Sequence, residues 1–118
     1  MNITTLSADE TYNMTNDEIK KLTNLTNLDL SYNSSITDDG ISMLTNLTHL
    51  DLSYQNSISF EGIKMLTNLT ILNLKANRNE SITLENLDTL PNLSCVYVNH
   101  QILKTYKYDH KYKISIAI

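Results

Sequence analysis

One hydrophobic pattern recurs along the chain at a fixed interval of 22 residues. The phrase Leu-Thr-Asn-Leu-Thr-x-Leu-x-Leu begins at Leu22, Leu44 and Leu66, and a looser copy containing Pro91 begins at Leu90. A fixed period of about 20–29 residues with leucines in this spacing is typical of a solenoid, in which neighbouring repeats stack and bury one continuous core. The pattern therefore predicts a repeat fold before composition or charge is considered.

Within each copy, the spacing of the apolar residues changes from two to three. Leu28 and Leu30 are two residues apart, which places both side chains on one face of an extended segment. Further along, Ile41 and Leu44 are three residues apart, as on one face of a helix, and Thr37 is in position to cap that helix. Each copy therefore predicts a short strand followed by a short helix, and the strands stack into a parallel sheet with a spacing of about 4.8 Å.

Three segments depart from the regular copies. Residues 1–21 are a degenerate first repeat, in which Ala8 replaces a leucine and Thr15–Glu18 has the capping-box pattern of a helix start. Asn77–Ser81 adds two residues to the third copy, which predicts a loop. Residues 113–118 alternate isoleucine with other residues, which predicts a strand, either as the last rung or folded over the open end. We predict one domain over residues 1–118, with an N-terminal repeat or cap (1–21), repeats (22–103) and a C-terminal cap strand (104–118).

The motif Leu-x-x-Leu-x-Leu-x-x-Asn resembles the leucine-rich-repeat family, and the short repeats with the Leu-Thr-Asn-Leu-Thr phrase resemble its internalin type. The resemblance covers roughly residues 1–103. It implies an α/β fold, a right-handed solenoid with a parallel sheet on the concave side and short helices on the convex side. In the family, the asparagine after the strand turns inward and bonds the backbone of adjacent coils, a structural ladder that Asn33 and Asn77 match.

Two glutamines interrupt this asparagine ladder. Gln55 and Gln101 stand where the motif has asparagine, and Asn56 comes one residue late. We expect either a local distortion or a replacement of the missing asparagine by Asn56. Because an unmet buried backbone group costs roughly 1–3 kcal/mol, we also expect some hydrogen-bond partner for the backbone to be found.

The residues between the inward leucines should form rows along the concave face, beginning with Thr5–Glu10 in the first repeat. Asp29 and Asp51 would stand about 4.8 Å apart, an unfavourable pairing of like charges unless a cation or a basic partner is near. Tyr32 and Tyr54 would also be neighbours, and tyrosine is enriched at interaction hot spots. Two interpretations stay open: a pocket for a basic or mixed peptide, or residues inherited when one repeat was copied. The candidate partner-binding residues are Asp29, Asp51, Tyr32, Tyr54, His49, Asn73, Lys75 and Tyr97.

Composition limits the partners. The net charge of −4 and the pI of about 5.2 argue against a surface for nucleic acid or an anionic membrane. Cys95 is the only cysteine, so no intramolecular disulfide can form. The N-terminus lacks the pattern of a signal peptide, and no stretch approaches the ~20 apolar residues of a membrane span. These features predict an intracellular, cytoplasmic protein.

Catalytic chemistry has little support. Cys95 and His49 share a row but would lie two rungs apart, on the order of 10 Å, which is too far for a thiolate–imidazole pair. The three histidines have no metal-ligand spacing, and the two glycines form no phosphate-binding loop. We therefore expect no enzyme activity, no metal site and no cofactor.

The sequence thus predicts a non-catalytic module that binds a protein or peptide, basic or mixed in charge, through its concave face. One alternative is a structural protein that self-associates through the C-terminal strand, so monomer and oligomer both stay open. Another is the substrate-recognition part of a ubiquitin ligase, because Ile36–Ile41 and Ile58–Ile63 resemble repeats attached to F-box proteins. We expect this alternative to be the weaker one, because residues 1–21 have no F-box-like helical pattern.

Overall fold

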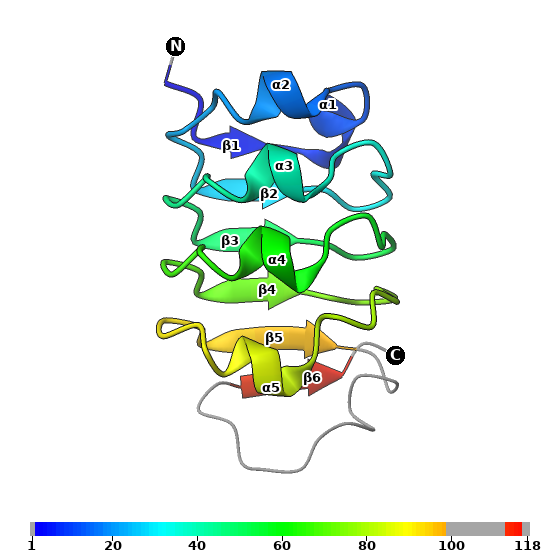
Figure 1. Cartoon of the computed structure of the whole chain (residues 1–118), viewed down its shortest axis with the longest axis vertical. Coiled ribbons are helices and arrows are strands. Elements are labelled where there is room, and N and C mark those ends of the chain that lie inside the picture. Colours follow the sequence, from blue (N-terminus) through cyan, green and yellow to red (C-terminus); the bar gives the residue numbers. More distant parts are fainter. Residues whose placement is uncertain (1, 99–112, 117–118) are drawn as a thin grey trace.

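The chain forms a ladder of parallel strands with short helices along one side (Figure 1). The computed structural model describes residues 2–98 and 113–116, the latter for their backbone alone. The six strands follow chain order across one sheet: β1 (Thr5–Leu6), β2 (Asn27–Asp29), β3 (His49–Asp51), β4 (Ile71–Asn73), β5 (Cys95–Val98) and β6 (Lys113–Ile116). The helices are α1 (Ala8–Thr11), α2 (Asn16–Ile19), α3 (Asp38–Ile41), α4 (Phe60–Ile63) and α5 (Leu84–Leu87). This arrangement confirms the predicted α/β solenoid with a parallel sheet.

Neighbouring strands pair in a register that follows the sequence period. Leu28 pairs with Leu50, and Leu50 with Leu72, so equivalent positions of successive repeats stand side by side. We number the coils accordingly as coil 1 (residues 1–21), coil 2 (22–43), coil 3 (44–65) and coil 4 (66–89). β6 pairs in parallel with β5, which makes the C-terminal strand the last rung of the sheet. The alternative of a strand folded over the open end is wrong.

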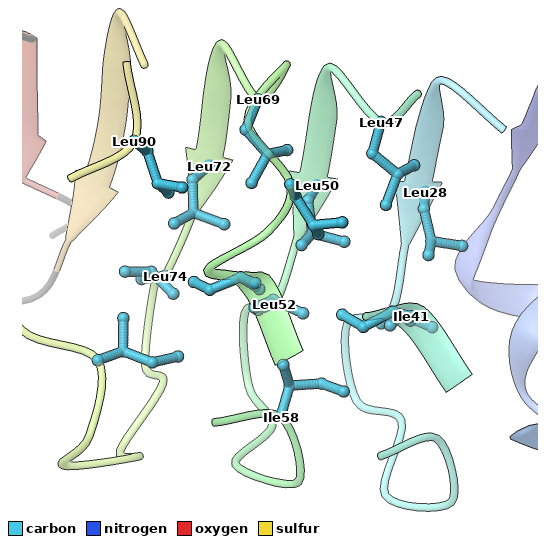
Figure 2. Packing of buried hydrophobic residues seen from close by; sticks show 14 of the residues in the cluster. Leu28, Ile41, Leu47, Leu50, Leu52, Ile58, Leu69, Leu72, Leu74 and Leu90 are labelled. Carbon is cyan, nitrogen blue, oxygen red and sulfur yellow. The ribbon is translucent and has the colours of Figure 1, made fainter. Parts of the chain in front are cut away.

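The hydrophobic core lies between the sheet and the helices. Leu28, Leu50 and Leu72 project into it from the strands, and Ile41 of α3 joins the same cluster (Figure 2). These four side chains are at most 3% exposed. Burying one such side chain contributes about 1.5–3 kcal/mol. The residues between the inward leucines are thereby turned to the concave side.

Coil 1 leaves the sheet earlier than expected. Ser7 caps α1, because its hydroxyl accepts the Glu10 N–H at 3.3 Å while the Glu10 carboxylate accepts the Ser7 N–H at 3.1 Å. Asp9 and Glu10 are therefore in a helix, and the expectation that they begin two concave rows is wrong. The predicted capping box at Thr15–Glu18 is confirmed at the start of α2.

The convex helices approach one another closely. Thr37 precedes α3 as predicted but makes no side-chain cap; its backbone N–H donates instead to Asn16 Oδ1 of the preceding coil at 3.0 Å. Asp38 accepts the Ser59 N–H in the same way at 2.8 Å. A Cβ atom added at Gly62 would lie 2.4 Å from Asp38 Oδ1, so this position requires glycine. The hydrogen bond between Asp38 and Ser59 therefore depends on the absence of a side chain at Gly62 in α4.

The asparagine ladder is confirmed at both matching positions. Asn33 is 3% exposed, and its Nδ2 donates to the Thr11 carbonyl at 2.9 Å while its Oδ1 accepts the Ile36 N–H at 2.8 Å. Asn77 Nδ2 donates to the Leu52 carbonyl at 2.8 Å.

Gln55 fills the intervening position itself, and its Oε1 accepts the Ile58 N–H at 3.2 Å. The expected partner for the buried backbone is therefore found, and it is Gln55 itself and not Asn56, while the buried Nε2 of the Gln55 amide is left without a partner in residues 2–98. Gln101 lies outside the described residues.

The Leu-Thr-Asn-Leu-Thr turn carries two further ladders, which explain why it recurs. In the last three of the four turns, the asparagine amide donates to a threonine carbonyl of the preceding coil at 2.8 Å, from Asn46, Asn68 and Asn92 to Thr23, Thr45 and Thr67. The second threonine donates its hydroxyl to the equivalent carbonyl one coil earlier, as Thr48 does to Thr26 at 3.1 Å. The asparagine and the second threonine of the turn thus tie one coil to the next.

Candidate functional site

The concave face holds a shallow trough of about 260 Å³. The strand register places Asp29 beside Asp51, and Asp51 beside Asn73. The lining residues are Leu6, Asn27, Leu28, Asp29, His49, Leu50, Asp51, Ile71, Asn73 and Tyr97. Five of the eight sequence-predicted binding residues, Asp29, His49, Asp51, Asn73 and Tyr97, therefore meet in one hollow.

Asp29 and Asp51, the acidic residues of the trough, also have a structural role. Asp29 Oδ1 accepts the Ser31 N–H at 2.9 Å, and Asp51 Oδ1 accepts the Ser53 N–H at 2.9 Å. In each case the aspartate side chain accepts the backbone N–H of the residue two positions later and so forms an Asx turn at the end of the strand. Within the described part of the chain, Asp29 Oδ2 has no partner, so its charge is available on the concave side.

Donors from coils 3 and 4 compensate part of the like-charge contact. The Ser53 hydroxyl donates to Asp51 Oδ1 at 2.6 Å, and Asn73 Nδ2 approaches Asp51 Oδ2 at 3.4 Å. The two carboxylates can therefore stand on adjacent rungs without a bound cation.

His49 adds an imidazole ring to the trough. His49 Nδ1 lies 2.9 Å from the Thr48 hydroxyl, which is also 3.1 Å from the Thr26 carbonyl. Of the two ring nitrogens, one carries a proton and the other a lone pair in the neutral imidazole, so the ring can accept as well as donate a hydrogen bond. Together with the two carboxylates, the ring makes the middle of the trough rich in acceptors.

Tyr32 and Tyr54 form a stacked pair at the edge of the sheet. Their ring centroids are 4.6 Å apart and the planes differ by 6°, and Lys75 Nζ lies 5.7 Å from the Tyr54 centroid. The backbone φ is 61° at Tyr32, 55° at Tyr54 and 54° at Ala76. The left-handed conformation thus recurs at this point of coils 2, 3 and 4, and it turns the tyrosines away from the aspartates.

The expected single pocket is consequently divided in two. Tyr32 and Tyr54 line a second hollow of about 430 Å³, which we name the tyrosine-edge pocket; its other residues are Gln55, Asn56, Ala76 and Arg78. Lys75 stands against the Tyr54 ring and belongs with this pocket. Sequence reasoning missed Arg78 and Asn56, although the two-residue insertion next to Arg78 was a visible signal.

Residues considered for catalysis or metal binding do not come together. His49 and Cys95 are both register partners of Ile71, which therefore separates them as expected. Among the described residues, no three His, Cys, Asp or Glu side chains gather closely enough to hold a metal ion. No helix within the described ranges is long and apolar enough to cross a membrane.

A clear charge pair lies on the convex helices. Lys20 Nζ is 3.0 Å from Asp17 and 3.7 Å from Asp39. The hydrogen bond from Lys20 lowers the pKa of Asp17, and the same bond raises the pKa of Lys20. This pair is fully exposed and away from the trough.

Comparisons with known proteins agree with the geometry. A leucine-rich-repeat family model matches residues 21–45 and 44–66. The structure is similar to internalin C2 of Listeria monocytogenes, with a TM-score of 0.64 and 26% identity over 96% of this chain. It is also similar in fold to the leucine-rich-repeat protein LegL7 of Legionella pneumophila, with a TM-score of 0.55 and 22% identity over 91% of this chain. No curated protein sequence matches the chain.

The chain spans 44% of the length of that internalin and 41% of LegL7. Leucine-rich-repeat folds generally serve as protein-interaction modules and as scaffolds without enzyme activity. Together, the repeat match over residues 21–66 and the structural similarity support a leucine-rich-repeat solenoid with internalin-like repeats.

Proposed function

We propose that the chain binds a basic segment of a partner protein in its concave trough, without catalysing a reaction. The observation that carries this proposal is the alignment of Asp29 with Asp51 beside His49. These groups offer carboxylate and imidazole acceptors, which suit the donors of an arginine or lysine side chain. The preformed curve of the sheet lowers the ordering cost of association.

A selection from displayed random peptides, compared between the wild type and an Asp29→Asn/Asp51→Asn variant, tests this proposal. Asparagine removes the charge but keeps the Oδ1 acceptor of the turn, as Asn73 does for the Lys75 N–H at 3.0 Å. We expect peptides enriched in arginine or lysine for the wild type and loss of this enrichment for the variant.

An Asp39→Asn/Glu85→Gln variant is the matched control, because it removes two exposed acidic charges from the convex helices. It should select the same peptides as the wild type. If the trough variant also selects them, or if no variant selects basic peptides, the trough is not the binding site.

Self-association through β6 is a second candidate. β6 is last in the sheet order, and β5 is its one strand neighbour among the described residues. An edge strand can pair with another chain. Light scattering of the full chain and of a variant lacking residues 111–118 separates the two functions: concentration-dependent oligomers that the folded deletion variant no longer forms would favour assembly, and a monomeric full chain would exclude it.

A further inference from the structure

The two-residue insertion of coil 4 forms a pinned loop. Asn79 Nδ2 donates to the Asn56 carbonyl of the preceding coil at 3.0 Å, and Asn79 Oδ1 accepts the Ser81 N–H at 3.0 Å. The Asn79 N–H itself donates to Asn77 Oδ1 at 2.9 Å. Both residues that flank Arg78 are thus held in place. A loop ordered in advance costs less to bind with than a loose one.

This loop carries Arg78 to the wall of the tyrosine-edge pocket, which a stacked aromatic pair also lines. Tyr32 is 66% exposed and Tyr54 is 41% exposed, so both rings offer surface to a ligand. Tyrosine and arginine are the residue types that most often dominate binding energy in protein interfaces. The hollow of about 430 Å³ has room for one or two side chains of a partner.

Within the described ranges, the cations at this pocket lack an acidic partner, unlike Lys20 and Lys64 of the convex side. Lys20 and Lys64 are both paired with carboxylates of the convex helices. Lys75 and Arg78 have no carboxylate within ion-pair distance in the described part of the chain, although residues 1–100 hold twelve acidic side chains against five basic ones. Two unpaired cations therefore stand at one pocket of an otherwise acidic solenoid.

The wall of the pocket adds hydrogen-bond donors. Gln55 lines it, although its Nε2 is buried below the surface and is not exposed to a ligand. The Asn56 side chain also lines the pocket and has no partner there. Donors and positive charge together favour a ligand with oxygen acceptors and negative charge.

We propose that the tyrosine-edge pocket binds a carboxylate side chain, Asp or Glu, of a protein partner, with Arg78 as its ion-pair residue. The proposal deepens the proposed function and rests on it for the nature of the partner. A partner segment with a basic group in the trough and an acidic group at this edge would bind in one orientation along the solenoid. The reason is that the acidic residues lie in coils 2 and 3, whereas the cations lie in coil 4. Charge complementarity of this kind sets register and orientation.

The test uses nuclear magnetic resonance, because Arg78 is the only arginine of the chain and gives a single Nε–H signal. The probes are blocked Gly-Glu-Gly, Gly-Gln-Gly and Gly-Lys-Gly tripeptides and sodium phosphate. We expect Gly-Glu-Gly to shift the Arg78 Nε–H and Asn56 amide signals with a Kd on the order of millimolar. Gly-Gln-Gly should leave them unchanged.

An Arg78→Gln variant should weaken the Gly-Glu-Gly response at Asn56 roughly two- to fivefold, the range of an exposed ion pair. Lys21→Gln is the matched control, because Lys21 is exposed and unpaired among the described residues but is remote from the pocket; it should change nothing. Equal shifts from Gly-Glu-Gly and Gly-Gln-Gly, no shift from either, or a stronger response to phosphate would overturn the carboxylate assignment. Gly-Lys-Gly reports separately on Asn27 and Asn73 in the trough, so a failure there counts against the proposed function and not against this pocket.

Discussion

Coils 2 and 3 are near copies of each other, whereas coil 4 exchanges the same positions for other residues. Asp29 and Asp51 become Asn73, yet its Oδ1 still accepts the backbone N–H two residues on, at 3.0 Å. Tyr32 and Tyr54 become Ala76, yet φ stays at 54°. The first position therefore requires a side-chain acceptor but no charge. The second requires a left-handed backbone conformation but no aromatic ring. What coils 2 and 3 carry beyond those requirements is available for binding, or was inherited by copying.

The same comparison on the convex side predicts the largest effect. Coils 2 and 3 have Gly40 and Gly62 in their helices, and coil 4 has Asn86 at the equivalent position. We expect Gly62→Ala to lower the free energy of unfolding by about 1–3 kcal/mol, as overpacking does. The added Cβ would lie 2.4 Å from Asp38 Oδ1 and 3.1 Å from Asp38 Cα, so backbone as well as side chain must move.

Gly40→Ala is the matched variant, and urea unfolding measures both. The nearest atom to its Cβ is Asn16 Oδ1 at 2.4 Å, at the end of a side chain, and the backbone of coil 1 is not among its three nearest atoms. The loss should therefore be smaller than for Gly62→Ala. If Gly40→Ala lowers the free energy of unfolding as much as Gly62→Ala or more, the close approach of neighbouring helices does not determine the cost of these substitutions.

The asparagine ladder predicts a gain in stability. Coil 3 has Gln55 between the well-bonded Asn33 and Asn77, with one donor unmet in residues 2–98 and a 3.2 Å bond to Ile58 where Asn33 makes a 2.8 Å bond. We expect Gln55→Asn to raise the free energy of unfolding by about 1 kcal/mol, because leaving a buried donor unpaired is costly. Asn33→Gln should lower it by a similar amount. If Gln55→Asn destabilises the chain instead, the longer side chain has a packing role that outweighs its unmet donor.

The strands were predictable because inward leucines two apart admit one register, and that register also gave the row of Asp29 and Asp51. The path of the chain beyond the strand was harder to predict. The left-handed turn at Tyr32 is set by the stacking of whole coils, and nothing local marks it, since tyrosine has no preference for positive φ. The early helix α1 did have a local signal, a second capping box at Ser7 and Glu10, which the match to later repeats concealed. Arg78 became a candidate only when the structure placed the inserted loop, and Arg78 with it, at the tyrosine-edge pocket.

The smallest expected effect separates the two interpretations of the tyrosine pair. Tyr54 contacts both Tyr32 and Lys75, whereas Tyr32 has the ring of Tyr54 alone as an aromatic neighbour in the described chain. An exposed aromatic pair contributes about 0.5 kcal/mol, the low end of its range, so Tyr32→Ala should lower the free energy of unfolding by that amount and Tyr54→Ala by slightly more. Ala76 already shows that alanine tolerates this backbone conformation, so neither loss includes new strain. A double-mutant cycle from urea unfolding measures the coupling. A coupling well above this value would make the pair a structural element of coils 2 and 3, whereas a small coupling, together with a weaker response to Gly-Glu-Gly in both variants, would assign the pair to binding.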